Sequence, residues 1–269
     1  MNVEEDAIFA ANWIDFSGRI CIVTGAAGGM GQEITRSFLD LGAQVAAVDI
    51  NGRGCADFVA TLGLLDTSVA AFQCDIADPD AVIATEAATR AHFGPADILV
   101  NNAAALGKNA LQDTSFADWQ RVIDVNLSGY FHCAKVYGEQ MMKRHAGVII
   151  HIASIAAHEP VNNAGAYSPS KAGIHMMSRQ IACEWGPFGI RSNTISPGMI
   201  RTPFSEATYR QDGVEAFRKG KIPVRSIGLP RQVADAVMFL ASDRASYVTG
   251  GDILIDGGLS QTLMAQFPR

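Results

Sequence analysis

The chain contains 269 residues, of which 48% are hydrophobic and 18% are charged, and this balance excludes a disordered or low-complexity protein. The formal net charge of −6 argues against nucleic acid or an anionic membrane surface as a partner, because both attract basic proteins. No apolar run approaches the ~20 residues of a membrane span, and the acidic segment Met1–Asp6 is unlike a secretory signal or transit peptide. We therefore expect a cytoplasmic protein with a small-molecule substrate.

The five cysteines and six histidines form no metal-binding or disulfide motif in the sequence. The cysteines are scattered and contain no C-x-x-C pair, so we expect reduced, mostly buried thiols. His158-Glu159 is not followed by a second histidine at the interval that a zinc-binding helix requires. The sequence predicts no catalytic metal.

The chain alternates short apolar runs with longer amphipathic segments. Residues 1–17 are expected to form an N-terminal extension, and residues 18–269 a single domain, because no linker divides them. Seven mostly continuous apolar runs are predicted as strands: Arg19–Thr24, Gln44–Asp49, Ala70–Cys74, Asp97–Asn101, Val148–Ala153, Arg191–Ile195 and Ile253–Asp256. This pattern is typical of a Rossmann-like, doubly wound α/β fold with seven parallel strands and helices on both faces.

Helical segments are predicted between these strands. Asp78-Pro79 is typical of an N-cap followed by a first-turn proline, and that helix should end near Gly94. One long helix is predicted over Trp119–Arg144 and another over Ala166–Trp185. The segment Pro203–Pro223 is expected to form a mobile helical lid over the substrate.

A glycine-rich turn, Thr24–Gly31, follows the first predicted strand and opens the first helix. The pyrophosphate of a dinucleotide needs backbone N–H groups close by, and glycine permits that approach. Asp49 ends the second strand, 24 positions beyond Gly25, near the ~20 expected for an acid that binds the adenosine ribose. Its carboxylate favours NAD, because it would repel the 2′-phosphate of NADP. Arg53 keeps NADP open as a less favoured alternative.

Four polar residues form a candidate catalytic set. Tyr167 and Lys171 lie one helical turn apart on one face. Ser154 follows the strand Val148–Ala153, where the carboxyl end should border the ligand crevice, and Asn126 lies in the preceding helix. Each residue alone also fits a structural role, as a packing tyrosine, a solvated lysine, a helix-capping serine or a buried asparagine. Their order beside a cofactor turn favours an active site.

Together these motifs resemble the short-chain dehydrogenase/reductase family, in its single-domain form, over about residues 18–258. The family's T-G-x-x-x-G-x-G, N-N-A-G and Y-x-x-x-K motifs match Thr24–Gly31, Asn101–Ala104 and Tyr167 to Lys171. The resemblance implies Asn126, Ser154, Tyr167 and Lys171 as catalytic residues. It implies cofactor contacts from Gly25, Gly28, Gly29, Met30, Gly31, Asp49, Ile50, Asp75, Ile76, Asn102, Ala103, Ala104, Tyr167, Lys171, Pro197, Gly198, Ile200 and Thr202.

The family mechanism implies a role for each catalytic residue. Tyr167 would exchange a proton with the substrate oxygen, and Lys171 would lower the pKa of that phenol and bind the nicotinamide ribose. Ser154 would stabilise charge on the substrate oxygen, and Asn126 would hold a water in a proton relay. Hydride transfer is expected from the pro-S face. Ala104 replaces the glycine of N-N-A-G, which would cost roughly 1 kcal/mol if this position required positive φ.

The expected reaction interconverts a secondary alcohol, such as a sugar, polyol or cyclic alcohol, and its ketone. Candidate substrate contacts are Ala104, Leu106, Ala156, His158, Asn162, Asn163, Met199 and Phe204. Two other functions stay open: a 3-oxoacyl-thioester (acyl carrier protein) reductase, which would favour NADPH, and a catalytically silent NAD-binding sensor or scaffold. The resemblance also implies a homotetramer, with the two long helices in one interface and the last strand and tail in another.

Overall fold

A computed structural model of the protein describes residues 13–203 and 205–262. Seven parallel strands form one sheet in the order β3-β2-β1-β4-β5-β6-β7. They are β1 (Ile20–Thr24), β2 (Gln44–Asp49), β3 (Val69–Gln73), β4 (Ile98–Asn101), β5 (Gly147–Ile152), β6 (Ile190–Pro197) and β7 (Asp252–Ile255). The predicted sheet is confirmed. Its chain order reverses between β1 and β4, and doubly wound sheets bind ligands at that switch point.

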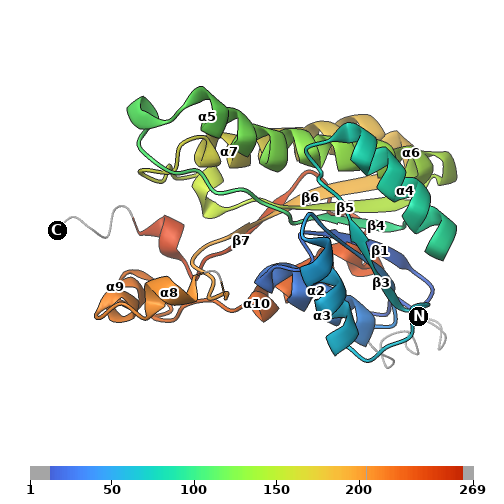
Figure 1. Cartoon of the computed structure of the whole chain (residues 1–269), viewed down its shortest axis with the longest axis horizontal. Helices are drawn as coiled ribbons and strands as arrows, with labels where there is room; N and C mark the ends of the chain where they lie inside the picture. Colours follow the sequence, from blue (N-terminus) through green and yellow to red (C-terminus); the bar gives the residue numbers. More distant parts are fainter. Residues whose placement is uncertain (1–12, 204, 263–269) are drawn as a thin grey trace, which may run out of the picture.

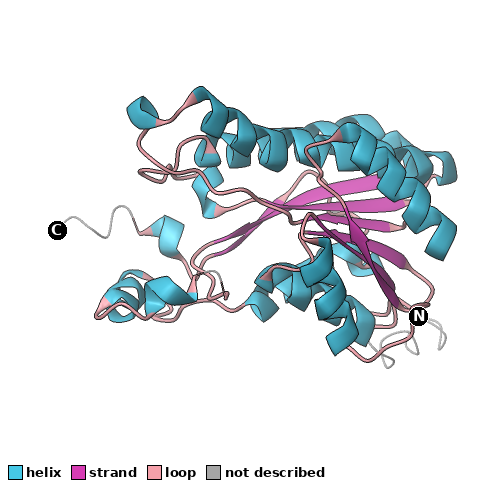
Figure 2. Ribbon diagram, viewed as in Figure 1, coloured by secondary structure: helices cyan, strands magenta, loops and turns pink. Residues whose placement is uncertain are grey.

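Helices cover both faces of the sheet (Figures 1 and 2). One layer contains α4 (Pro79–Phe93), α5 (Phe116–Ile123), α6 (Gly129–Arg144) and α7 (Tyr167–Trp185). The opposite layer contains α2 (Gly29–Asp40), α3 (Gly52–Thr61) and α10 (Pro230–Ala241). Short helical turns join them: η1 (Leu111–Asp113), η2 (Asp124–Ser128), η3 (Ile155–Ala157), η4 (Gly186–Phe188), η5 (Asp243–Ala245) and η6 (Leu259–Gln261).

The two layers explain why the strands are continuously apolar. In β1, Cys21 and Val23 pack into the core that includes Phe38 of α2, whereas Ile22 packs into the core that includes Tyr130 of α6. Side chains alternate across a strand, so a sheet covered on both sides buries both faces of its inner strands. All five cysteines are free and four of them are buried, as expected from their scattered spacing.

Capping residues set the start of two helices. The Asp78 side chain accepts a hydrogen bond from the backbone N–H of Asp80 at 2.9 Å, and Pro79 occupies the first turn of α4. This matches the sequence prediction. The long helix predicted from Trp119 instead begins earlier, because Ser115 caps α5 by accepting from the N–H of Asp118 at 3.1 Å.

The predicted long helix is also interrupted. Between α5 and α6, η2 is a π-helical turn that contains Asn126. The sequence could not predict this turn, because the bonds of the Asn126 side chain go to residues distant in the sequence. Turns of this type occur frequently at functional sites.

The expected lid segment is helical in part. It contains α8 (Glu206–Tyr209) and α9 (Val214–Lys221), which project beyond the sheet (Figure 1). Tyr209, Ile222 and Ile227 form a small buried cluster of their own. Phe204 lies outside the described residues, and movement of the lid stays a prediction. No helix within the two described ranges has the length and apolarity needed to cross a membrane.

Candidate active site

The glycine-rich turn forms a backbone cradle at the end of β1. Gly25 has φ of +66°, and a Cβ atom there would lie 2.7 Å from Cα of Ala103. A Cβ atom at Gly31 would collide with the carbonyl oxygen of Gly25. The helix α2 starts directly behind the turn, and Gly28, its N-cap, provides no side-chain cap. Backbone N–H groups at such a helix start suit an anionic pyrophosphate.

The loops after β1 and β4 are locked together at the switch point. Asn102 Nδ2 donates to the carbonyl oxygens of Thr24 and Gly25 at 3.0 and 3.1 Å. The backbone N–H groups of Asn102 and Ala103 donate to Thr24 Oγ1 at 3.0 and 3.2 Å. Non-glycine residues with positive φ in the described ranges are Asn109, His145, Asn163 and Arg225. Ala104 is not one of them, so its replacement of glycine needs no strained backbone.

The Asp49 carboxylate is held in a fixed orientation at the end of β2. Its Oδ2 accepts from the N–H of Ala27, and its Oδ1 accepts from the N–H of Asn51, both at 2.9 Å. Arg53 does not approach this carboxylate. Its side chain is 93% exposed and lies 4.0 Å from Asp57. The site beside Asp49 therefore presents an acceptor for hydroxyl groups without the Arg53 cation that could bind a phosphate.

One cavity of about 970 Å³ connects this carboxylate with Tyr167. The predicted residues that line it are Gly25, Gly28, Gly29, Met30, Gly31, Asp49, Ile50, Asp75, Ile76, Asn102, Ala103, Ala104, Leu106, Tyr167 and Thr202. Six other predicted site residues do not line this cavity: Asn126, Ser154, Lys171, Pro197, Gly198 and Ile200.

The sequence analysis missed one wall of the cavity. This wall includes Ala117, Gln120, Arg121 and Asp124 of α5 and η2. Their spacing places them on one helix face, so amphipathic periodicity could have identified them. The other additional lining residues are Val48, Cys74, Ala77, Ala105 and Val125.

Tyr167 is half-buried at the start of α7, and its surroundings have opposing effects on its acidity. Burial raises the pKa of Tyr167 above its usual value, and a hydrogen bond with Ser154 partly offsets this rise. The serine hydroxyl thus acts directly on the phenol. The pair can exchange a proton with a bound oxygen and stabilise charge there.

Lys171 is buried one helical turn after Tyr167 on α7. Its Nζ donates to the carbonyl oxygen of Ile152 at 2.8 Å and lies 5.7 Å from the ring centroid of Tyr167. Burial lowers the pKa of Lys171 to about 7. Burial raises the pKa of Tyr167, and the expectation that Lys171 holds this pKa below its usual value stays a prediction. Burial disfavours both charged forms, and the lysine itself is only partly protonated near neutral pH.

Asn126 does not line the cavity but forms hydrogen bonds with the segments around it. Its Oδ1 accepts from the N–H of Ala105 at 2.8 Å, and its Nδ2 donates to the Ala105 carbonyl and to Ser170 Oγ, both at 3.0 Å. These bonds connect the loop after β4 with α7. The side chain is therefore a positioning group, and its role in holding a relay water stays a prediction.

The remaining candidate substrate residues are dispersed. Met199 lines a separate cavity of about 430 Å³, Ala156 is buried, and Asn162 and Asn163 are exposed. His158 lies outside the main cavity and contacts Asp252. The substrate end of the site is thus less completely predicted than its cofactor end.

Similar proteins cover nearly the whole chain. Residues 25–260 match the family model described as enoyl-(acyl carrier protein) reductase. A D-threitol dehydrogenase from Mycolicibacterium smegmatis is 37% identical over 241 residues, covering 90% of this chain and 92% of that protein. A 3-oxoacyl-[acyl-carrier-protein] reductase from Thermotoga maritima is 34% identical over 242 residues, covering 90% of this chain and 98% of that protein.

Two crystal structures share the fold. A short-chain type dehydrogenase/reductase from Mycobacterium marinum has a TM-score of 0.83 and 32% identity, covering 91% of this chain and 96% of that chain. A candidate 2-deoxy-d-gluconate 3-dehydrogenase from Agrobacterium tumefaciens, with bound NADP, has a TM-score of 0.82 and 31% identity, covering 91% of this chain and 97% of that chain.

Proposed function

The chain belongs to the short-chain dehydrogenase/reductase family, and we propose that it is an NAD-dependent enzyme that interconverts a secondary alcohol and its ketone. The assignment to an oxidoreductase class follows from the family. The finer proposal rests on one observation: a single cavity is bordered by the glycine turn, by Asp49 and by Tyr167. A cofactor and a proton-exchanging group can therefore meet there.

The residues present fit a nicotinamide dinucleotide. Gly25 to Gly31 would hold the pyrophosphate, Asp49 the adenosine ribose, and Asp75 and Ile76 the adenine side of the cavity. When bound, this cofactor carries the hydride. The oriented Asp49 carboxylate and the distant Arg53 side chain support NAD. NADP is the second candidate, because a similar protein binds it.

The proposed proton chemistry belongs to the side chains around Tyr167. In reduction its hydroxyl would give a proton to the ketone oxygen, and in oxidation the phenolate would take one from the alcohol. Ser154 would donate a hydrogen bond to the same substrate oxygen as charge develops there. Lys171 would place a nitrogen donor between this phenol and the nicotinamide ribose. Asn126 would keep the loop after β4 and α7 in register.

The proposed substrate class is a sugar, polyol or cyclic alcohol, supported by the similarity to D-threitol dehydrogenase. A 3-oxoacyl-thioester reductase is the second candidate, supported by the 34% identity to such an enzyme. That function needs basic surface for an acidic carrier protein. In the short basic cluster Lys143 to His145, the Arg144 side chain already contacts the Ala96 carbonyl and Asp97.

We also propose a homotetramer located in the cytoplasm. Phe131 of α6 and Met176 of α7 are 49% and 59% exposed, and such apolar groups on neighbouring helices favour association. Leu254 of β7 is 38% exposed at the free edge of the sheet, where a second interface would lie.

A direct test compares cofactors and substrates in one assay. Polyols, sugars, cyclic alcohols and 3-oxoacyl thioesters are each supplied with NAD(H) and NADP(H). We expect kcat/KM to be at least tenfold higher with NAD and a polyol or cyclic alcohol, a difference of about 1.4 kcal/mol. Asp49→Ala should narrow the cofactor difference, whereas Asp66→Ala, an exposed acid outside the cavity, should leave it unchanged. Equal use of both cofactors by the native protein would contradict the NAD assignment.

A further inference from the structure

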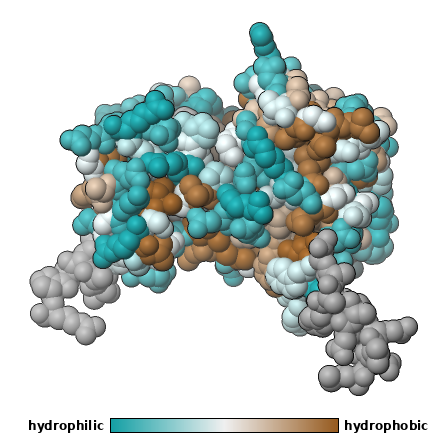
Figure 3. All heavy atoms as spheres, turned by 90° about the horizontal axis from the view of Figure 1, so that it is seen from below, coloured by the Kyte–Doolittle hydropathy of each residue, from teal (hydrophilic) through white to brown (hydrophobic). Residues whose placement is uncertain are grey.

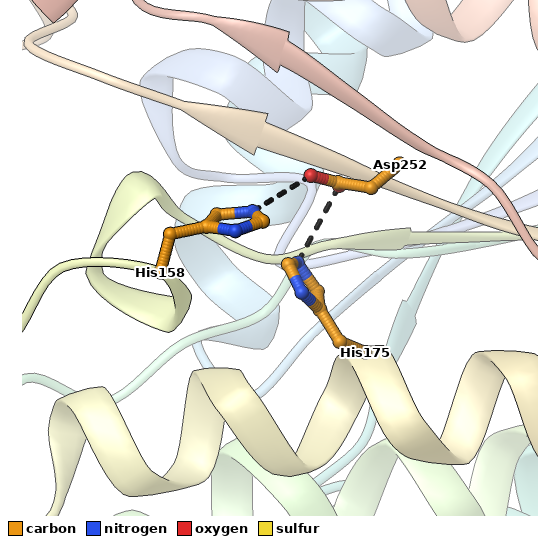
Figure 4. A group of neighbouring side chains, drawn as sticks. All are labelled: His158, His175 and Asp252. Atoms are coloured by element: carbon orange, nitrogen blue, oxygen red, sulfur yellow. Dashed lines mark hydrogen bonds and ion pairs between the residues drawn. The ribbon is translucent and has the colours of Figure 1, made fainter. Parts of the chain in front are cut away.

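Three side chains from distant parts of the chain converge beside the proposed active site. His158 follows η3, His175 lies on α7, and Asp252 begins β7. Figure 4 shows both imidazole rings directed at the one carboxylate. The Nε2 atom of His158 lies 2.9 Å from Asp252 Oδ2, and that of His175 lies 3.4 Å from Oδ1. One ligand atom from each residue lies within 4.8 Å of the other two.

The carboxylate is held by a second set of contacts. Its Oδ1 accepts hydrogen bonds from Thr194 Oγ1 at 2.7 Å and from Ser196 Oγ at 2.9 Å. These bonds fix the carboxylate plane and leave Oδ2 facing His158. Supporting hydrogen bonds of this kind orient the ligands of protein metal sites.

The cluster is mostly buried, but solvent can reach one of its three side chains. The side chains of His175 and Asp252 are 18% and 19% exposed, and that of His158 is 36% exposed. Burial raises the pKa of Asp252, but hydrogen bonds from His175, Thr194 and His158 outweigh it and lower that pKa to about 2. The carboxylate is therefore ionised at neutral pH, and solvent can reach the cluster through the His158 side.

The donor set selects a class of cation. Two imidazole nitrogens and one carboxylate oxygen suit Zn²⁺, Co²⁺ or Ni²⁺, whereas Mg²⁺ and Ca²⁺ prefer oxygen ligands alone. With metal–ligand bonds of about 2.0–2.1 Å, tetrahedral geometry places neighbouring ligand atoms roughly 3.3 Å apart. The two imidazole–carboxylate separations of 2.9 and 3.4 Å, one to each carboxylate oxygen, are close to this value, and the three ligand atoms lie within 4.8 Å of one another. We propose that His158, His175 and Asp252 bind one divalent transition-metal ion, with solvent completing its coordination.

This ion would be structural, because the three residues do not line the cofactor cavity. His158 lies four residues beyond Ser154, and His175 lies four residues beyond Lys171 on the same helix face. A bound ion would therefore fasten the segment that carries Ser154 to the helix that carries Tyr167. The expectation that no metal takes part in the chemistry is unaffected.

The test is a metal titration of the full chain without a histidine tag, after treatment with a chelator. Neither substrate nor cofactor is present, so the result is independent of the proposed function. Isothermal titration calorimetry with Zn²⁺ should show saturable binding of one ion per chain. Co²⁺ should give visible absorption bands typical of nitrogen ligation, and saturating Zn²⁺ should raise Tm because it binds the folded state.

Substitution of the ligands assigns the site. His175→Gln and Asp252→Asn should each weaken Zn²⁺ binding at least tenfold. His158 is the most exposed of the three residues, so His158→Gln removes one ligand with the least disturbance to folding. His92→Gln is the matched control, since His92 lies 3.4 Å from Asp66 in a simple pair, and it should bind as the native protein does. No saturable micromolar binding by the native chain would overturn the proposal, leaving a hydrogen-bonded cluster. Binding that survives all three ligand substitutions would overturn it too.

Discussion

Among single residues, Tyr167 combines a raised pKa with the proposed role of base in alcohol oxidation. The rate of oxidation should therefore rise with pH, because the phenolate is the reactive form. Ser154 lowers this pKa through its hydrogen bond. In Ser154→Ala, the rising limb of kcat/KM against pH should move to higher pH, in addition to a loss of rate.

Ser168→Ala is the control for this profile, because the Ser168 hydroxyl accepts from the N–H of Val161 and does not line the cofactor cavity. Its pH profile should match that of the native protein. An unchanged limb in Ser154→Ala would show that this serine does not set the acidity of Tyr167.

Removal of the phenol oxygen tests the proton exchange itself. Tyr167→Phe should lower kcat by about 100-fold or more, the usual contribution of a positioned acid or base. NADH binding, followed by its fluorescence, should change little because the ring still packs at the start of α7. A variant with most of its turnover intact would exclude Tyr167 as the acid–base group.

Lys171, a proposed active-site residue, also affects the stability of the fold. Its pKa is about 7 in the folded protein and about 10.4 when exposed. Between these values the unfolded chain binds the additional proton, so this residue makes stability increase as pH rises from about 7 to 10. Below pH 7 its destabilising effect is complete. At about 1.4 kcal/mol per pKa unit, the effect amounts to several kcal/mol.

Lys171→Met should therefore raise the free energy of unfolding at pH 7 and remove this contribution to its pH dependence. Urea unfolding at pH 6 to 10, with the native protein alongside, measures the difference. The buried tyrosines and cysteines titrate in both proteins, so their effects cancel in the comparison. Parallel pH profiles for the two proteins would exclude a depressed lysine pKa.

At the scale of elements, two glycines allow the cost of a left-handed backbone to be distinguished from the need for close approach between two loops. Gly25 and Gly63 have almost equal φ, +66° and +64°. A Cβ atom at Gly25 would lie 2.7 Å from Cα of Ala103, whereas one at Gly63 would meet nothing within 4 Å. Alanine at either position costs roughly 1 kcal/mol for its left-handed backbone.

Gly63→Ala should therefore lose only about 1 kcal/mol of stability and retain cofactor affinity. Gly25→Ala should lose more stability and at least tenfold in NADH affinity, because the loops after β1 and β4 must separate. Chemical denaturation and fluorescence titration measure the two quantities. Similar losses in both variants would mean that close approach at Gly25 has no special role.

The same elements show what the sequence could predict. The strands were found within two residues of their predicted bounds, because local apolar runs suffice for a sheet covered on both faces. Asp78 and Pro79 predicted the start of α4 for the same local reason. The π-helical turn at Asn126 depends on bonds to Ala105 and Ser170, which periodicity does not reveal.

The candidate site follows the same division. Asp49 was predictable because its spacing from the glycine turn follows from one βαβ unit. The raised pKa of Tyr167 could not be predicted, because it depends on how far the folded chain excludes water from the phenol. His158, His175 and Asp252 meet only through the fold, since two of them lie 94 residues apart. Local sequence spacing cannot detect such a cluster.

For the molecule as a whole, the open question is how its apolar surface is covered. The face seen from below carries apolar patches among hydrophilic side chains (Figure 3). In the layer formed by α4 to α7, Phe131 of α6 is 49% exposed. In the sheet, Leu254 is 38% exposed on the edge strand β7. Apolar groups at these two separate places match the two different interfaces that the proposed tetramer requires.

Size-exclusion chromatography with light scattering tests this assembly. Four chains of 28.6 kDa give an expected mass of about 114 kDa for the native protein. Phe131→Glu and Leu254→Glu should each reduce the mass to that of a dimer, because a buried unpaired carboxylate disrupts one interface and leaves the other. Leu65→Glu is the control: Leu65 is 76% exposed in the loop between α3 and β3, at the edge of the sheet opposite β7, and the variant should remain tetrameric. A monomeric native protein at micromolar concentration would contradict the proposed assembly, and a tetramer unaffected by either substitution would place its interfaces elsewhere.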